Sequence, residues 1–231
     1  GVTPGTSVVR FSGTPDQSAV GLAGSDLSWI ETVVSLGGFA VDGQDWTLSI
    51  DLDPTVAGVL QRSFHVTAES KALSKIVADW AGYFNGLVVG SVTFHAQSMV
   101  DIAGNAKIRL WATDGNGDAV DFWVDTTVGS NGTTQVSGTP DQNFAKIFGV
   151  DWTVAVFEVL QAQAGAWNLT LDGLLAATYP VTAGASIADV TTNLADRIST
   201  AFKPVVSGYT VTFDAPWPSE ATMRSSTACW N

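Results

Sequence analysis

The residues best suited to hold a metal ion lie in one short acidic stretch. Asp114, Asn116 and Asp118 alternate with small residues, and Asp125 follows at the twelfth position counted from Asp114. Oxygen ligands at the first, third, fifth and twelfth positions are typical of a calcium-binding loop. The sixth position, however, holds Ala119 where such a loop needs glycine, and the flanks have strand composition instead of helical composition. A β-turn rich in Asp, Asn and Gly is therefore favoured, and calcium binding stays open.

Histidine could carry acid–base or metal chemistry, since its charge changes near neutral pH. The chain has two, His65 and His95, both in stretches with strand composition. An internal repeat, described below, places Pro180 and Asp214 at the matching positions. Because a reaction carried by the repeated module should keep one histidine in both copies, surface positions on strands are favoured over catalytic or metal-binding roles.

Sequence patterns of familiar active sites are absent from the chain. It contains no Gly-x-Ser-x-Gly, His-Glu-x-x-His, Cys-x-x-Cys or phosphate-loop pattern. A glycosidase-type pair of carboxylates stays open, because any two of the 22 acidic residues could meet in the fold. We predict that the protein is not an enzyme, with no catalytic residues and no cofactor.

Tryptophan is abundant, with nine residues. Four of them recur in the internal repeat inside apolar alternation, so we expect them in the core: Trp29 with Trp152, and Trp46 with Trp167. Four others lie outside the repeat and are the better interface candidates: Trp111, Trp123, Trp217 and Trp230. Aromatic side chains concentrate where proteins meet, although exposed tryptophans could also bind a sugar.

The elements that must position these residues are organised by a repeat. The hexapeptide Ser-Gly-Thr-Pro-Asp-Gln occurs at residues 12–17 and again at residues 137–142. Matching stretches follow in the same order, beginning at Trp29 and Trp152, Trp46 and Trp167, Phe64 and Tyr179, and Val92 and Val211. Internal repetition of this kind predicts one structural module used twice.

Hydrophobic periodicity predicts the same elements in each copy. Trp46, Leu48, Ile50 and Leu52 alternate with polar residues, as in a half-buried strand, and its predicted partner covers residues 63–68. Apolar stripes at helical spacing follow at Leu73, Ile76, Val77, Trp80 and Phe84, and at Ile187, Val190, Leu194 and Ile198. Ser186 and Asp189 form a start that resembles a capping box. A last strand is expected at residues 87–96 and 205–215.

The order of these elements predicts a β-rich α+β fold. It comprises two tandem copies of an antiparallel sheet with one amphipathic helix, joined by a β-hairpin insert around residues 114–118. The expected boundaries are an N-terminal arm at 1–7, a first module at 8–97, a linking hairpin at 98–132, a second module at 133–216 and a C-terminal tail at 217–231.

Composition limits the classes of partner. The formal charge of −12 disfavours binding to nucleic acid and to anionic membranes, and no apolar run is long enough to span a bilayer. Charged residues make up only 14% of the chain, against about 25% in ordinary soluble domains. This low value is typical of a protein covered by its own copies or of a robust extracellular protein. A single cysteine, Cys229, cannot form a disulfide within the chain.

The second copy carries a family resemblance. The stretches Trp167-Asn-Leu-Thr-Leu-Asp-Gly173, Tyr179-Pro-Val-Thr-Ala-Gly184 and Ile187 to Ile198, preceded by Val136 to Pro140, resemble a tandem module of tailed-phage virion proteins and bacterial surface proteins. The first copy departs from this pattern at Asp53-Pro54, where the loop is longer. The resemblance implies a structural building block without catalytic residues.

Together these features predict a structural subunit of a phage virion, in a tail, fibre, baseplate or capsid decoration. We expect it to form a homo-oligomer, with a trimer favoured, and to contact other virion proteins. The alternative is an extracellular or cell-surface adhesin, or a carbohydrate-binding module that uses the exposed tryptophans.

Overall fold

A computed structural model of the chain describes residues 9–15, 27–53, 58–141, 152–171, 174–198, 204–214 and 225–226. The fold is β-rich α+β, with antiparallel sheets and two described helices. The chain forms two compact units. Unit 1 contains residues 1–19 and 142–231, and unit 2 contains residues 20–141. None of the helices in the described part of the chain is long and apolar enough to cross a membrane.

Unit 2 is built on a large antiparallel sheet with the strand order β10-β2-β7-β6-β5, to which β8 adds beside β7. The strands are β2 (Trp29–Gly38), β5 (Val88–Val89), β6 (Val92–Val100), β7 (Ala106–Thr113), β8 (Ala119–Val120) and β10 (Gly132–Pro140). Alternate residues are buried along β7, from Thr32 to Leu36 of β2, and at Phe94 and Ala96 of β6, as the period of a half-buried strand requires. Their buried side chains include Val34, Phe94, Ile108, Leu110 and Val136.

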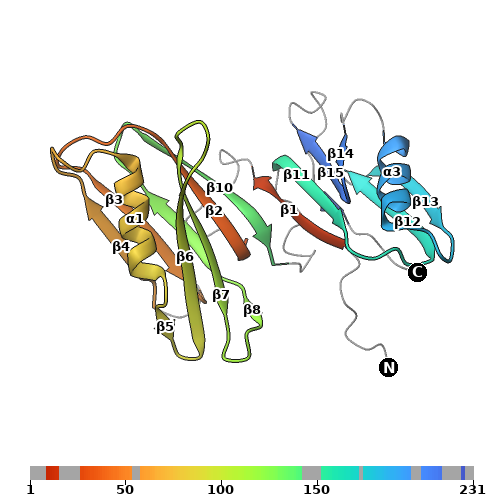
Figure 1. The fold of residues 1–231 in the computed structure, drawn as a ribbon, viewed down its shortest axis with the longest axis horizontal. Helices are drawn as coiled ribbons and strands as arrows, with labels where there is room; N and C mark the ends of the chain where they lie inside the picture. Colours follow the sequence, from red (N-terminus) through yellow and green to blue (C-terminus); the bar gives the residue numbers. More distant parts are fainter. Residues whose placement is uncertain are drawn as a thin grey trace. The chain divides into compact units, whose positions relative to one another are not determined.

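A second layer covers the buried face of this sheet (Figure 1). It contains a small sheet with the order β4-β3-β9 and the helix α1. The elements are β3 (Asp45–Asp51), β4 (Leu60–His65), α1 (Leu73–Phe84) and β9 (Trp123–Thr127). The predicted alternation is confirmed, since Trp46, Leu48 and Ile50 are fully buried and Trp46 pairs with Phe64. The Trp46 ring packs so closely on β10 that a Cβ at Gly132 would lie 2.5 Å from it.

The helix α1 forms where its apolar stripe was predicted. Ile76, Val77, Trp80 and Phe84 are buried, and the helix lies beside β4 and over β6 and β7. Its N-cap residue, Ala72, makes no side-chain hydrogen bond to the first turn. A bidentate ion pair from Arg62 of β4 to Asp79, with distances of 2.7 and 2.6 Å, fixes the helix beside the small sheet.

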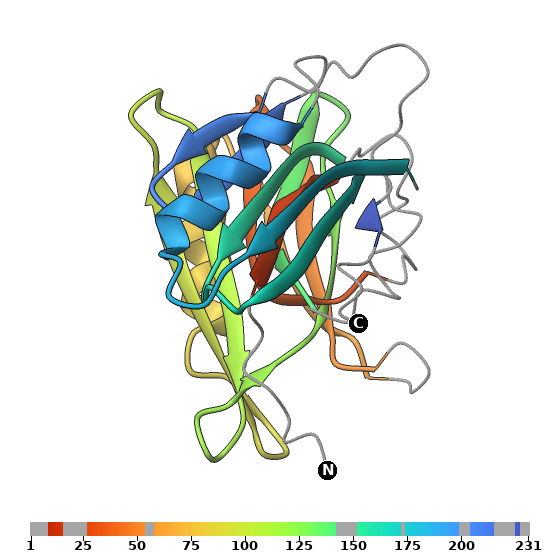
Figure 2. The same cartoon turned by 90° about the vertical axis from the view of Figure 1, so that its right-hand side faces the viewer.

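Unit 1 has a large antiparallel sheet with the order β14-β15-β11-β1 and a small sheet with the order β13-β12-β16. The elements are β1 (Val9–Pro15), β11 (Trp152–Val159), β12 (Gly165–Leu171), β13 (Leu174–Val181), α3 (Ile187–Arg197), β14 (Val205–Ser207), β15 (Thr210–Asp214) and β16 (Ser225–Ser226). The helix α3 packs beside β13 (Figure 2). Its predicted start is confirmed, because Ser186 and Asp189 form a reciprocal capping box.

Two sequence predictions need correction. The hairpin predicted around residues 114–118 within 98–132 forms between β7 and β8, but residues 123–127 do not continue it, because they pair as β9 with β3 in the other sheet. The strand β7 itself lies between β2 and β6, so this segment is part of the core of unit 2. The single last strand expected in each copy is a hairpin, because Gly90 and Gly208 both adopt φ +60° and reverse the chain.

Candidate functional site

A set of polar and aromatic side chains that contact one another lies on the outer face of the large sheet of unit 2. Odd-numbered residues of β2, β6, β7 and β10 point away from the core, because the buried residues of these strands, apart from Trp29, are even-numbered. The register sets these residues in rows across the sheet, with Glu31 opposite Trp111 and Trp111 opposite His95. We call this surface the outer face. Its members are Glu31, Val33, Ser35, Thr93, His95, Gln97, Met99, Lys107, Arg109, Trp111, Thr113, Thr133, Gln135, Ser137 and Thr139.

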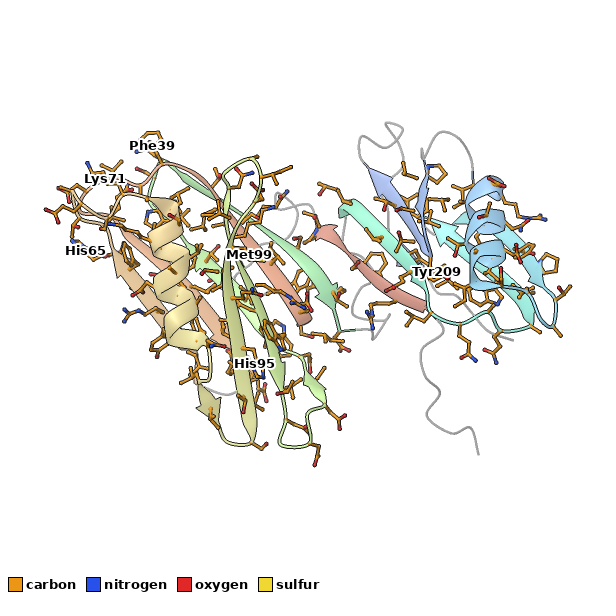
Figure 3. The ribbon with its side chains drawn as sticks, in the orientation of Figure 1. Phe39, His65, Lys71, His95, Met99 and Tyr209 are labelled. Carbon is orange, nitrogen blue, oxygen red and sulfur yellow. The ribbon has the colours of Figure 1, made fainter. Side chains whose placement is uncertain are left out.

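Trp111, one of the predicted interface tryptophans, is at the centre of a cluster on the outer face. The guanidinium of Arg109 lies 4.8 Å from the centre of its ring. The ring of His95 stacks on it with centroids 5.1 Å apart and an angle of 13° between the planes. His95 also forms a hydrogen bond of 3.1 Å between its Nε2 and the hydroxyl of Thr113. Figure 3 labels His95 on β6. The cluster is therefore held in place from two strands.

Glu31 completes this cluster from β2. It accepts two hydrogen bonds from Arg109, of 2.9 and 2.8 Å, in a bidentate ion pair. The hydrogen bonds to Glu31 raise the pKa of Arg109 above its usual value. Planar bidentate pairs of this kind fix the orientation of the guanidinium. Because Arg109 and His95 already contact the π system of Trp111, they compete with any sugar that would stack on that indole.

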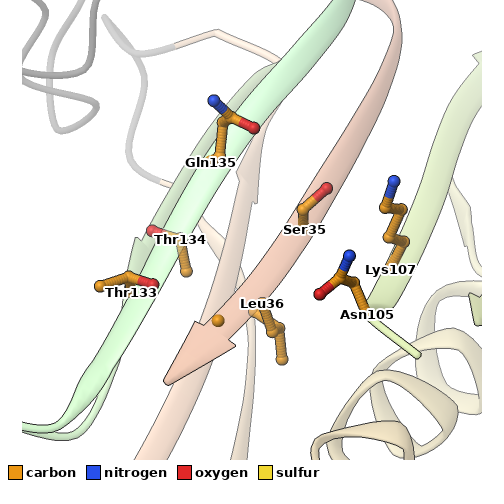
Figure 4. Close-up of a pocket in the computed structure, with 8 residues that line it drawn as sticks. Ser35, Leu36, Asn105, Lys107, Thr133, Thr134 and Gln135 are labelled. Carbon is orange, nitrogen blue, oxygen red and sulfur yellow. The ribbon is translucent and has the colours of Figure 1, made fainter. Parts of the chain in front are cut away.

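A shallow pocket of about 380 Å³ lies at one end of the outer face (Figure 4). Its lining is mostly polar and includes Ser35, Asn105, Lys107 and Gln135. The ammonium group of Lys107 pairs with the carboxylate of Asp101 at 2.9 Å, so the positive charge of Lys107 is already balanced. Hydrogen bonds from the Asn105 side chain and from Lys107 hold the pKa of Asp101 well below its ordinary range. The pocket therefore offers hydrogen-bonding groups but no net charge.

The acidic stretch considered for calcium forms a turn between β7 and β8. The carboxylate of Asp114 accepts hydrogen bonds from the backbone N–H groups of Asn116 and Asp118, at 2.8 and 2.9 Å. These bonds lower the pKa of Asp114. Asp125 lies on β9, opposite Ser49 of the small sheet, and accepts from the N–H of Thr126. The predicted β-turn is therefore present, and calcium binding stays the open alternative to it.

Of the other site candidates, His65 and Trp123 belong to the small sheet β4-β3-β9 of unit 2. His65 is exposed at the end of β4 and pairs with Asp45 at 2.8 Å. Trp123 is half-buried on β9, opposite Asp51. Trp217 and Trp230 lie outside the described residues. Trp29, Trp46 and Trp167 are buried, which confirms their predicted place in the core.

Two features of this site could not be found from the sequence. Arg109 and Glu31 are 78 positions apart and meet because β7 lies directly beside β2. The stacking of His95 on Trp111 depends on the register of β6 against β7. Within the described ranges, no three His, Cys, Asp or Glu residues cluster in a way that could hold a metal ion.

Comparison of the chain with protein-family models, with curated proteins and with solved structures gives no match.

Proposed function

We propose that the protein is a non-enzymatic structural subunit that assembles with copies of itself through a duplicated module. The assembly we propose is part of a tailed-phage virion, as a tail, fibre, baseplate or capsid-decorating component, with a trimer as the favoured oligomer. The chain would then contain two tandem copies of one sheet-and-helix module, and its partners would be its own copies and other virion proteins.

Equivalent strand pairings support the duplicated module. Trp46 is opposite Phe64 in unit 2, and Trp167 is opposite Tyr179 in unit 1. These four residues are the ones that the sequence repeat matches. In both units an amphipathic helix follows this pair, and a hairpin follows the helix. A match of order and register in two segments of one chain is what duplication produces.

The observation that carries the proposal is a pair of equivalent hairpins with exposed apolar side chains. The edge strand β5 presents Val88, which is 60% exposed. The edge strand β14 presents Val205 and Val206, which are 56% and 40% exposed. Tyr209, labelled in Figure 3, is 54% exposed in the turn between β14 and β15. Within the described residues, each of these edge strands pairs on one side alone.

Exposed edge strands favour contact between copies. An edge leaves backbone N–H and C=O groups free to pair with another strand, and proteins that avoid such pairing place charges there. Here the edges carry valine instead. Burying a valine side chain contributes roughly 1.5–3 kcal/mol. Two equivalent edges on one chain let each copy contact two neighbours, which is the requirement for a ring or a tube.

The test is to place charge on these edges. We expect Val88→Lys and Val206→Lys to weaken self-association measured by multi-angle light scattering, because a lysine on an edge strand opposes pairing. The matched controls are Ile102→Lys in unit 2 and Leu160→Lys in unit 1, which change the same charge at exposed apolar positions off these edges. Equal effects from edge and control variants would refute the proposal, as would a parent protein that stays monomeric at high concentration.

Carbohydrate binding is the second candidate, in an extracellular adhesin. The position of Trp111 on a polar face beside a pocket favours it, whereas the contacts of Trp111 with Arg109 and His95 oppose it. A glycan array decides between the two candidates. A specific glycan signal that Trp111→Ala abolishes would support the adhesin.

A further inference from the structure

The two copies of the Ser-Gly-Thr-Pro segment pair with strands in an identical register. In β1, Gly13 is opposite Ala155 and Pro15 is opposite Trp152, with a register shift between Thr14 and Pro15. The second copy repeats this arrangement in β10. There, Gly138 is opposite Thr32 and Pro140 is opposite Trp29, with a register shift between Thr139 and Pro140.

Each segment pairs with the tryptophan strand that follows the other segment in the sequence. The first segment, at residues 12–15, precedes Trp29 but pairs with the strand of Trp152. The second, at residues 137–140, precedes Trp152 but pairs with the strand of Trp29. The division of the chain agrees, since residues 1–19 belong to the same unit as residues 142–231. The two repeats have therefore exchanged their first strands.

Such an exchange requires that the two segments are interchangeable. Their identical residues and register mean that either one can complete either sheet with the same backbone hydrogen bonds. Gly138 shows what the position demands, because a Cβ there would clash with the carbonyl oxygen of Glu31 and lie 2.8 Å from Thr32 Cα. Both segments have glycine at this position, Gly13 and Gly138, so neither brings a Cβ to it.

We propose that the segment at residues 9–15 is a donor strand that a second copy of this chain can supply, so that copies link by exchange of β1. The position that β1 occupies beside β11 can be filled by any Ser-Gly-Thr-Pro segment, whether it comes from the same chain or from another copy. Exchange of an identical element between copies keeps every contact of the closed chain. The balance then depends on the effective concentration of the chain's own strand against the concentration of other copies. High local concentration, as in an assembly, favours the linked form.

This inference goes beyond the proposed function. It concerns β1 and β11, whereas the proposed assembly uses the hairpin edges at β5 and β14. Strand exchange could occur in a protein that belongs to no virion. The two ideas can therefore fail separately.

The experiment uses cysteine pairs in the full-length chain with Cys229→Ser. Ser12 and Val156 are directly opposite one another, at a Cβ separation of about 4.5–5.5 Å that a short bis-maleimide can bridge. Within one chain, we expect Ser12→Cys with Val156→Cys to crosslink and Ser12→Cys with Val33→Cys to remain open. Efficient crosslinking of the second pair instead of the first would overturn the exchange between repeats.

Mixing two single variants tests exchange between copies. Chains with Ser12→Cys, labelled with ¹⁵N, are refolded together with unlabelled chains that carry Val156→Cys. We expect crosslinks between labelled and unlabelled chains, identified by mass spectrometry, at least about tenfold above a control mixture in which the exposed, off-edge Ile102→Cys replaces Val156→Cys. The yield should rise with protein concentration. A yield no higher than the control at every concentration would overturn the proposal. Circular dichroism of each variant establishes that it is folded.

Discussion

Replacing Gly138 by alanine tests how closely β10 lies against β2. Gly138 has φ +150°, and an added Cβ would clash with the carbonyl oxygen of Glu31 and lie 2.8 Å from Thr32 Cα. Both neighbours are backbone atoms of a central strand, so they cannot turn away as a flexible side chain would. We therefore expect Gly138→Ala to destabilise unit 2.

The magnitude follows from two contributions. A non-glycine residue in a sparsely populated backbone conformation costs about 1–3 kcal/mol, and an overpacked position costs about 1–3 kcal/mol more. The sum is roughly 2–6 kcal/mol, a large part of the 5–15 kcal/mol that stabilises ordinary domains. At about 4 °C per kcal/mol, the melting temperature should fall by roughly 8–24 °C.

The assay is thermal and urea unfolding followed by circular dichroism, with two control variants in the same unit. Gly117→Ala adds backbone strain alone, because its φ is +87° and nothing lies within 4 Å of its added Cβ. Gly82→Ala adds neither, and it should stabilise the exposed part of α1 by about 0.5–1 kcal/mol. We expect Gly138→Ala to be the least stable of the three. A Gly138→Ala protein within about 0.5 kcal/mol of the parent would refute the close packing of β10 on β2.

Three further predictions concern the caps, acid stability and calcium. Ser186→Ala should lower the free energy of unfolding by about 1 kcal/mol and Ala72→Ser should raise it by a similar amount, because α3 has a side-chain cap and α1 has none. Urea titration measures both free energies, and equal shifts of the same sign would contradict the capping argument. Because the pKa of Asp101 is lowered in the folded chain, its contribution to stability is present above the unfolded pKa near 3.9 and is lost as pH falls through the folded value. The melting temperature of Asp101→Asn should therefore fall less than that of the parent between about pH 5 and pH 2. Exposed Asp42→Asn is the control, and a larger fall in Asp101→Asn would be inconsistent with this. Since Asp114 is engaged in its own turn, calorimetry should detect no calcium binding, and heat that Asp118→Ala removes would show the opposite.

Local patterns predicted the elements whose pairing or packing is local. The alternation from Trp46 to Ile50 and the stripe on α1 were sufficient, because each period reports which side chains are buried. The capping box at Ser186 and Asp189 was visible for the same reason, since its two partners are three positions apart.

Features set by the order of strands could not be predicted. Nothing near residues 106–127 in the sequence indicates that β7 enters one sheet while β9 joins the other. The pairing of β1 with β11 and of β10 with β2 was hidden for a different reason. The two Ser-Gly-Thr-Pro segments are identical, so the sequence assigns neither of them to a particular tryptophan strand.

The proposed role as a self-assembling subunit is tested most directly by the mass of the purified chain in solution. Sedimentation velocity across a wide range of concentration, with electron micrographs of the same samples, measures the oligomer and its shape. Our account predicts a closed ring, a tube or a trimer that grows from monomer as concentration rises. A single species of about 24.1 kDa at every concentration would contradict it.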